Sequence, residues 1–211
     1  MSKYIVSDYK AIIFDLGAVL LNINYQDTID AFKALGIKNF DEIFSKAKQS
    51  TLTDDFEKGN ISEKEFFGSL KQLLHTNVNE SDLIAAWNIM LKDLPQQRVD
   101  LVKKCQAILP TFLLSNTNYT HIVDYHAYLQ KNFKVDNMST WFTNVYYSFE
   151  MRKRKPDANI FEQVLNENKL NATEVLYIDD SPQHIESAKK LGIVSHHLLD
   201  TEDVCDILLL K

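Results

Sequence analysis

Polar side chains that could carry out phosphoryl chemistry follow apolar runs at several places in this chain. An aspartate can attack phosphorus, and a Mg²⁺ ion held by carboxylate oxygens offsets the repulsion between that aspartate and a phosphate dianion. A lysine and nearby hydroxyl or amide donors stabilise the phosphoryl oxygens. The residues of these types at the ends of apolar runs, or just before a proline, are Asp15, Ser115 with Asn116, Lys155, and Asp179 with Asp180.

Each of these residues also has a simpler structural explanation. Asp15 could begin a turn, and Ser115 with Asn116 could do the same. Lys155 ends a run of four basic residues, 152–155, and such a run is usually a solvated face. Asp179 and Asp180 could cap the following helix. The joint occurrence of all four signals in one order favours a single site over four coincidences.

The elements predicted around these residues would bring them to one edge of a sheet. Ile12, Ile13 and Phe14 form a short apolar run typical of a parallel strand buried on both faces. Further strands are expected over 111–114, 144–147, 175–178 and 194–199, alternating with helices, and Asp200 is expected to cap a C-terminal helix. This pattern predicts an α/β fold with a Rossmann-like parallel sheet and helices on both faces. Ligands of such sheets bind at the carboxyl ends of the strands.

Residues 22–92 show helical periodicity without a convincing strand. One stripe contains Ile29, Phe32 and Leu35, and a second contains Phe40, Ile43, Phe44 and Ala47. The stretch TLTDDFEKGN (51–60) is predicted to be a loop, and Ser62 with Glu65 forms a capping-box pattern that opens a third helix. Ser81 is expected to cap a fourth. We therefore predict a core domain of residues 1–21 and 96–211, with a small α-helical cap of residues 22–95 inserted after the first strand.

Composition restricts the class of partner. A net charge of −6 argues against a nucleic-acid surface, because neutralising phosphates requires a basic one. The two cysteines lack any metal-binding spacing, which indicates a reducing compartment. No signal-peptide pattern and no membrane-length apolar segment is present, so a cytoplasmic protein without a membrane partner is expected. The sequence does not indicate an oligomeric state.

Four motifs resemble those of the haloacid dehalogenase-like (HAD) hydrolase superfamily. They are FDLGAVL, LLSNTN, the Lys-Pro of RKPDANIF, and LYIDDSPQHIESAKKLG. Among its subgroups, the chain is most similar to bacterial sugar-phosphate phosphatases, including α-glucose-1-phosphate phosphatase.

The resemblance implies a Mg²⁺-dependent phosphatase of small phosphorylated metabolites, with sugar phosphates expected. Asp15 would be the nucleophile and form an aspartyl-phosphate. Asp15, Asp180 and the carbonyl of Gly17 would bind Mg²⁺, with Asp179 acting through water or on Lys155. Ser115, the Asn116 amide and Lys155 would hold the phosphoryl group. A mobile cap would cover the site, with Glu57 and Lys58 approaching the sugar.

Two residues depart from the superfamily pattern. Most phosphatases of the superfamily have a second aspartate two residues after the nucleophile, where it protonates the leaving group, but this chain has Gly17. Arg152 stands where relatives often have glycine, and its long side chain could block the site. Two alternatives follow: a phospho-ligand-binding protein without turnover, or a 2-haloacid dehalogenase, which needs no metal and would leave Asp179 and Asp180 unexplained.

Overall fold

Five parallel strands form the central sheet of the computed structural model, which describes residues 3–38, 40 and 51–211. Across the sheet, the strands are β4 (Asn144–Tyr147), β3 (Thr111–Ser115), β2 (Ala11–Phe14), β5 (Val175–Asp179) and β6 (Val194–His197). Each of the five strands overlaps one expected from the sequence. The predicted Rossmann-like α/β fold is thereby confirmed.

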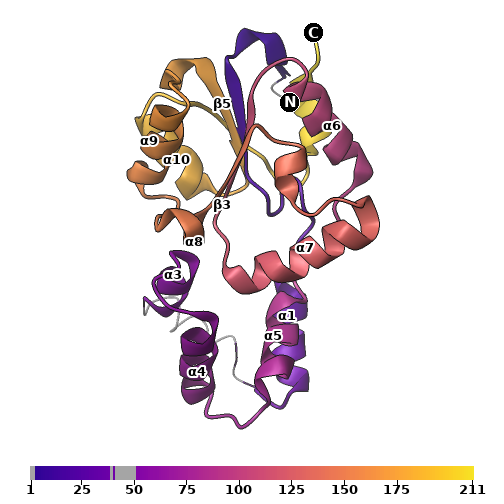
Figure 1. The fold of residues 1–211 in the computed structure, drawn as a ribbon, viewed down its shortest axis with the longest axis vertical. Helices are drawn as coiled ribbons and strands as arrows, with labels where there is room; N and C mark the ends of the chain where they lie inside the picture. Colours follow the sequence, from indigo (N-terminus) through magenta and orange to yellow (C-terminus); the bar gives the residue numbers. More distant parts are fainter. Residues whose placement is uncertain (1–2, 39, 41–50) are drawn as a thin grey trace.

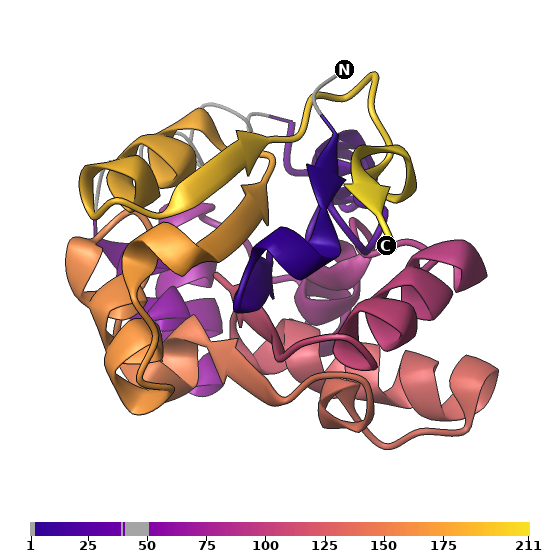
Figure 2. The ribbon, with the colours of Figure 1, turned by 90° about the horizontal axis from the view of Figure 1, so that it is seen from above.

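Helices cover both faces of this sheet, because alternate residues of each buried strand point to opposite sides (Figures 1 and 2). Ile12 and Phe14 pack with α6 (Gln96–Gln106), α7 (Tyr119–Phe133) and α11 (Val204–Ile207). Ile13, between them, packs with α9 (Ala158–Glu167) and α10 (Pro182–Lys190). Both faces of the sheet are thus covered by helices, and a ligand can approach the sheet only at the ends of its strands.

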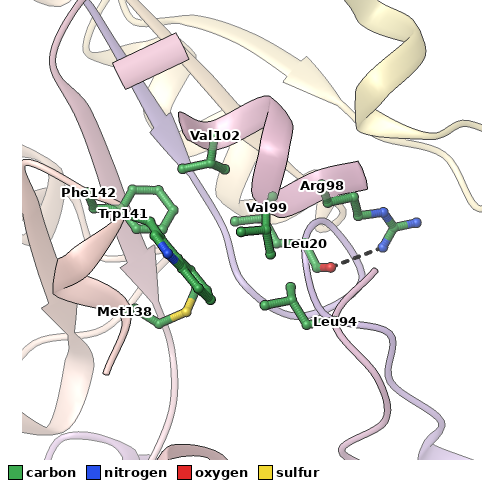
Figure 3. Close-up of a pocket in the computed structure, with 8 residues that line it drawn as sticks. All are labelled: Leu20, Leu94, Arg98, Val99, Val102, Met138, Trp141 and Phe142. Carbon is green, nitrogen blue, oxygen red and sulfur yellow. Dashed lines mark hydrogen bonds between the residues drawn. The ribbon is translucent and has the colours of Figure 1, made fainter. Parts of the chain in front are cut away.

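The contact between α6 and the sheet is filled by apolar side chains (Figure 3). Val99 and Val102 of α6 lie near Trp141 and Phe142, and the space among them cannot hold a water-sized molecule. Arg98 turns away from this cluster and donates to the carbonyl of Leu20 at 3.3 Å. This cluster is therefore packing that supports β2, not a ligand site.

The cap lies below the core in Figure 1 and has its own cluster of buried apolar side chains. Its described helices are α1 (Tyr25–Ala34), α3 (Leu52–Glu57), α4 (Glu63–Leu73) and α5 (Glu80–Asn88). Phe56 and Phe66 stack at 4.1 Å between ring centroids, and Phe66 also meets Trp87 edge-on. The chain passes between core and cap through two segments, 22–24 and 90–93. These two segments run antiparallel and form backbone hydrogen bonds with each other. The exact domain boundaries stay a prediction.

The structure corrects two predictions in the cap. The stretch 51–60, predicted as a loop, contains helix α3, because Phe56 is buried in the cap cluster and tertiary packing outweighs the polar composition. Helix α5 begins after Asn79, so Ser81 lies inside its first turn. The capping box of Ser62 and Glu65 is confirmed. The predicted second stripe lies, apart from Phe40, outside the described residues.

Further corrections concern short elements of the core. Strand β1 (Tyr4–Ile5) pairs with β7 (Leu208–Leu209) in a separate two-stranded sheet. Each strand has two residues, which is too short for a periodic pattern to predict it. The C-terminal helix α11 is capped by Asp203, not Asp200, and the capping side chain accepts from the backbone N–H of Cys205. No helix in the described part of the chain combines the length and apolarity needed to cross a membrane.

Candidate active site

The carboxyl ends of β2, β3 and β5 meet at the edge of the sheet that faces the cap. Phe14 of β2 pairs with Leu113 of β3 and Ile178 of β5, so the residues that follow these partners lie side by side. The backbone N–H of Asp15 continues the ladder by donating to the Ile178 carbonyl at 2.9 Å. The parallel register therefore brings Asp15 next to Asp179, as the sequence predicts.

Lys155 connects these two aspartates. Its ammonium donates to Asp15 Oδ1 at 2.6 Å, to Asp179 Oδ2 at 2.7 Å and to the carbonyl of Leu114 at 2.8 Å. These bonds use all three donors of the group, and the side chain is fully buried. Burial alone would lower the pKa of Lys155, but the charges of Asp15 and Asp179 raise it above its usual value, so the lysine is charged. The ammonium is thus fixed between two carboxylates.

Asn116 holds the backbone that carries this lysine. Its side-chain nitrogen donates to the carbonyl of Lys155 at 2.8 Å, and its side-chain oxygen accepts from the N–H of Lys155 at 2.9 Å. The Asn116 side chain therefore positions Lys155. Because both of its polar atoms are used in this way, Asn116 can contact a phosphoryl group only through its backbone N–H. The hydroxyl of Ser115 donates to the Asn116 carbonyl at 3.5 Å, which is at the outer limit of a hydrogen bond.

Asp179 accepts hydrogen bonds from four groups. Its Oδ1 accepts from the N–H of Ser181 at 2.7 Å, its Oδ2 from Lys155 and the hydroxyl of Tyr177, and both oxygens lie 3.0 Å from Nδ1 of His184. Burial opposes ionisation, but the charge of Lys155 and the hydrogen bond from His184 outweigh it and hold the pKa of Asp179 well below its usual range. Asp179 is thus an ionised residue that orients Lys155.

Tyr177 and His184 are site residues that the sequence did not single out. Tyr177 lies two residues before Asp179 on the same strand, so both side chains point to the same face of the sheet. This alternation could have identified Tyr177 from the sequence. His184 lies in the first turn of α10, which begins at Pro182, separated from the Asp179–Asp180 pair by one residue. The histidines of this chain show no metal-binding spacing, so the sequence gives no sign that His184 belongs to the site.

Tyr177→Phe is expected to lower the free energy of unfolding by about 1.5–3 kcal/mol, the range for a lost hydrogen bond to a charged group. The phenylalanine ring fills the same buried volume, so the change reports the hydroxyl alone. Tyr128→Phe is the matched control, because the Tyr128 hydroxyl accepts from the neutral backbone N–H of Leu94 at 3.0 Å and should cost about 1 kcal/mol. Urea denaturation measures both values, and equal losses would contradict the ionised state of Asp179.

Asp15, Asp179 and Asp180 could together hold a metal ion. One carboxylate oxygen from each lies within 4.8 Å of the others. Burial raises the pKa of Asp15 to about 7, opposed by the charge of Lys155 and reinforced by that of Asp179. Burial and the charge of Asp179 also raise the pKa of Asp180. Three carboxyl groups face one ammonium group, and a divalent cation would favour the ionised form of all three.

Gly17 lies two residues after Asp15, in a tight turn. The N–H of Ala18 donates to the carbonyl of Leu21 at 2.8 Å, and Ala18, not the glycine, has a positive φ of 58°. Among the described residues, a Cβ atom at Gly17 would meet only the side chain of Ile23, at 3.5 Å, which is ordinary contact. The position could therefore accept a side chain, and the absence of an aspartate there is not dictated by space.

The remaining flagged residues lie where the cap meets the core. Arg152 has a φ of 57°, a left-handed conformation that glycine adopts most easily, which explains why a glycine would suit this position. Its guanidinium donates to the carbonyl of Gly59 in the cap. Glu57 pairs with Arg154, and Lys58 pairs with Asp157. These five side chains therefore bind the cap to the core.

Known proteins resemble the chain over nearly its full length. The sequence is 24% identical over 183 residues to D-ribitol-5-phosphate phosphatase of Bacteroides thetaiotaomicron, covering 87% of this chain and 88% of the relative. It is 25% identical over 201 residues to a sesquiterpene phosphatase of Aspergillus oryzae, covering 93% of both.

A solved structure and a family description agree with these relatives. The structure is a HAD family enzyme of Bacteroides thetaiotaomicron in complex with magnesium and inorganic phosphate. It is 31% identical, covers 93% of this chain and 97% of its own, and superposes with a TM-score of 0.82. Residues 12–197 match the family described as haloacid dehalogenase-like hydrolase. With Asp15, the buried Lys155 and the paired Asp179 and Asp180 all inside that match, this chain belongs to the haloacid dehalogenase-like hydrolase family.

Proposed function

We propose that the protein is a Mg²⁺-dependent phosphatase that hydrolyses small phosphorylated metabolites, with Asp15 as the nucleophile. The observation that carries the proposal is the cluster of three carboxyl groups, Asp15, Asp179 and Asp180, around the buried ammonium of Lys155. Hydrolysis of a phosphate ester needs an attacking oxygen, a cation and fixed positive charge, and this edge of the sheet supplies or can bind each of them.

The proposed reaction has two displacements at phosphorus. A carboxylate oxygen of Asp15 forms a bond to phosphorus while the ester P–O bond breaks, and the alcohol leaves with a proton from solvent. Water then attacks the phosphoryl group on Asp15, releasing inorganic phosphate and the free carboxylate. Lys155 fixes the Asp15 carboxylate through Oδ1 and offsets the charge of the phosphoryl oxygens. The Ser115 hydroxyl and the backbone N–H of Asn116 are assigned to the same oxygens.

The donor set fits Mg²⁺, which takes carboxylate and carbonyl oxygens together with water and phosphate. Asp15, Asp180 and the Gly17 carbonyl are assigned as ligands, because the oxygens of Asp179 already accept from Lys155, Tyr177, Ser181 and His184. Bound Mg²⁺ supplies Lewis-acid neutralisation of the carboxylate and the phosphate. The solved relative that binds magnesium and phosphate supports this assignment.

Sugar phosphates are the proposed substrates. D-ribitol-5-phosphate phosphatase supports this class. A cavity of about 440 Å³ between cap and core offers room for the part of the substrate beyond the phosphate. Its walls include Tyr119, three residues after Asn116, and Arg152, three residues before Lys155. The walls contain aromatic rings and polar groups, among them Phe56, Tyr119, Phe149, Ser62, Glu63 and Arg152.

Gly17 favours substrates whose leaving group needs little protonation. An anomeric, acyl or aryl oxygen departs more easily than a primary alkoxide, so esters of those oxygens should be preferred. We expect the rate to fall with increasing basicity of the leaving group across a panel of phosphate esters. A rate independent of that basicity would contradict a missing general acid.

Phosphate release from such a panel should depend on Mg²⁺. Removing the ion with a chelator is expected to lower the rate by about 10²-fold, because Lewis-acid stabilisation is worth several kcal/mol. Added Mg²⁺ should restore the rate and Ca²⁺ should not, since Ca²⁺ prefers more ligands in a looser geometry. Equal release with and without chelator would refute the proposal. Chloride release from 2-haloacids in the presence of chelator would instead identify a dehalogenase.

Gly17 also favours a second candidate function, binding of a phosphorylated ligand without turnover. Such a protein would bind phosphate in the presence of Mg²⁺ with an affinity measurable by calorimetry. It would release no phosphate from any ester in the panel. Turnover of even one ester that is lost in chelator would exclude it.

A further inference from the structure

The loop that carries Lys155 contacts the core on one side and the cap on the other. This lysine loop, residues 152–157, joins α8 (Ser148–Met151) to α9. On the core side, the side chain of Asn116 makes two hydrogen bonds to the backbone of Lys155, and the hydroxyl of Ser187 donates to the carbonyl of Pro156 at 2.6 Å. The core thus fixes the middle of the loop.

The cap contacts the same loop through charged groups. Arg154 pairs through Nη1 with Asp54 Oδ1 at 2.5 Å and through Nη2 with Glu57 Oε2 at 2.9 Å. Lys58 pairs with Asp157 at 3.2 Å, at the other end of the loop. Figure 1 shows α3, which carries Asp54 and Glu57, directly facing α8. The basic run 152–155 is therefore not simply a solvated face. Neighbouring residues point in different directions: Arg154 contacts the cap, and Lys155 contacts the carboxylates of Asp15 and Asp179.

Gly59 sets how closely the cap approaches. It lies in the turn after α3 with a φ of +62°, and a Cβ atom there would lie 2.3 Å from the carbonyl oxygen of Phe149 in α8. That oxygen belongs to the backbone and cannot move like a flexible side chain. Arg152 donates to the carbonyl of Gly59 at the same place. Any side chain at position 59 must therefore separate the cap from the core.

We propose that Gly59 and the ion pairs of Arg154 form a docking contact through which the cap holds the lysine loop, so that the placement of Lys155 depends on closure of the cap. Arg154 is then a positioning residue for Lys155. Its ion pairs are partly exposed, and such pairs are individually weak, which suits a contact that must open for substrate exchange. The kinetic consequence rests on the proposed function, whereas the structural consequence does not.

Gly59→Ala changes the contact in the cap, and its effect is measured at Lys155 in the core. The backbone N–H of Lys155, which donates to Asn116 Oδ1, is expected to exchange with solvent about fivefold faster or more, the low end of coupling between sites. In turnover, kcat/KM for a sugar 1-phosphate should fall by a similar factor.

Gly36→Ala is the matched control. Gly36 is also a cap glycine with a positive φ, of +87°, but no atom in the described part of the chain lies within 4 Å of a Cβ there. Both variants carry backbone strain, and only Gly59→Ala disturbs the approach to Phe149. Equal exchange rates of the Lys155 N–H in the two variants would overturn the proposal.

A second pair of variants answers the same question if Gly59→Ala does not fold. Asp54→Asn combined with Glu57→Gln removes the charges opposite Arg154 and should also speed exchange of the Lys155 N–H. Asp27→Asn removes a cap ion pair of similar exposure, with Lys92, that does not touch the lysine loop, and should leave that exchange unchanged. Identical behaviour of these variants would count against the docking contact. A wild-type protein without any turnover would refute the proposed function alone, because amide exchange is measured without substrate.

Discussion

Asp15→Asn is expected to reduce phosphate release by about 10³-fold or more, the largest loss that any single substitution in this chain should cause. Asparagine keeps the shape of the side chain and can still accept from Lys155, so the fold should survive. It lacks the negative oxygen that forms the bond to phosphorus, and enzymes that lose their nucleophile fall to the residual rate provided by binding and electrostatics. Phosphate release under saturating Mg²⁺ measures the loss.

Two further measurements make this result specific. Asp136→Asn removes an exposed aspartate in the segment after α7 and should leave the rate unchanged. Acid quenching of wild-type turnover should trap protein whose mass is increased by one phosphoryl group on the peptide that contains Asp15, and the Asp15→Asn protein should show no such peptide. An Asp15→Asn protein that releases phosphate at the wild-type rate would show that water, not Asp15, attacks the phosphorus.

The position of the site was predictable because it depends on strand ends. Asp15, Ser115 and Asp179 each end or follow an apolar run, and parallel strands place such residues at one edge whatever the rest of the fold does. Lys155 was predictable only from the motif, since a basic run gives no local sign that one of its members is buried. Its three hydrogen bonds in the core explain why this member alone is removed from solvent.

What the sequence did not reveal depends on contacts between distant segments. His184 reaches Asp179 because α10 starts against the sheet edge, and the sequence only places it in a helical turn. Helix α3 looked like a loop because four of its six residues are polar or charged, yet Phe56 anchors it in the cap. The close approach of Gly59 to Phe149 likewise requires the cap and core to be placed relative to each other. Local propensity cannot contain that information.

Gly17→Asp is expected to raise the rate on a primary-alcohol phosphate such as ribitol 5-phosphate by about 10²–10⁴-fold, the usual contribution of general acid catalysis. The turn can accept the change, because the φ of Gly17 is not positive and its added Cβ would make ordinary contact with Ile23. Position 17 is half-buried and lies two residues from Asp15, whose carboxyl group is clustered with that of Asp180. Like charges raise the pKa of a carboxyl group, so the pKa of the added acid should be raised, which keeps part of it protonated near neutral pH.

The control for this gain is Gly17→Asn, which has the same shape but carries no proton to transfer. It should leave the rate on ribitol 5-phosphate near the wild-type value. An aryl phosphate provides the second control, because its leaving group departs without protonation and Gly17→Asp should change that rate little. The acid should also add a descending limb to the pH–rate profile on the alkaline side, where it loses its proton. If Gly17→Asp and Gly17→Asn behave alike on both substrates, the leaving group obtains its proton from another source, and Gly17 does not limit which esters the protein can hydrolyse.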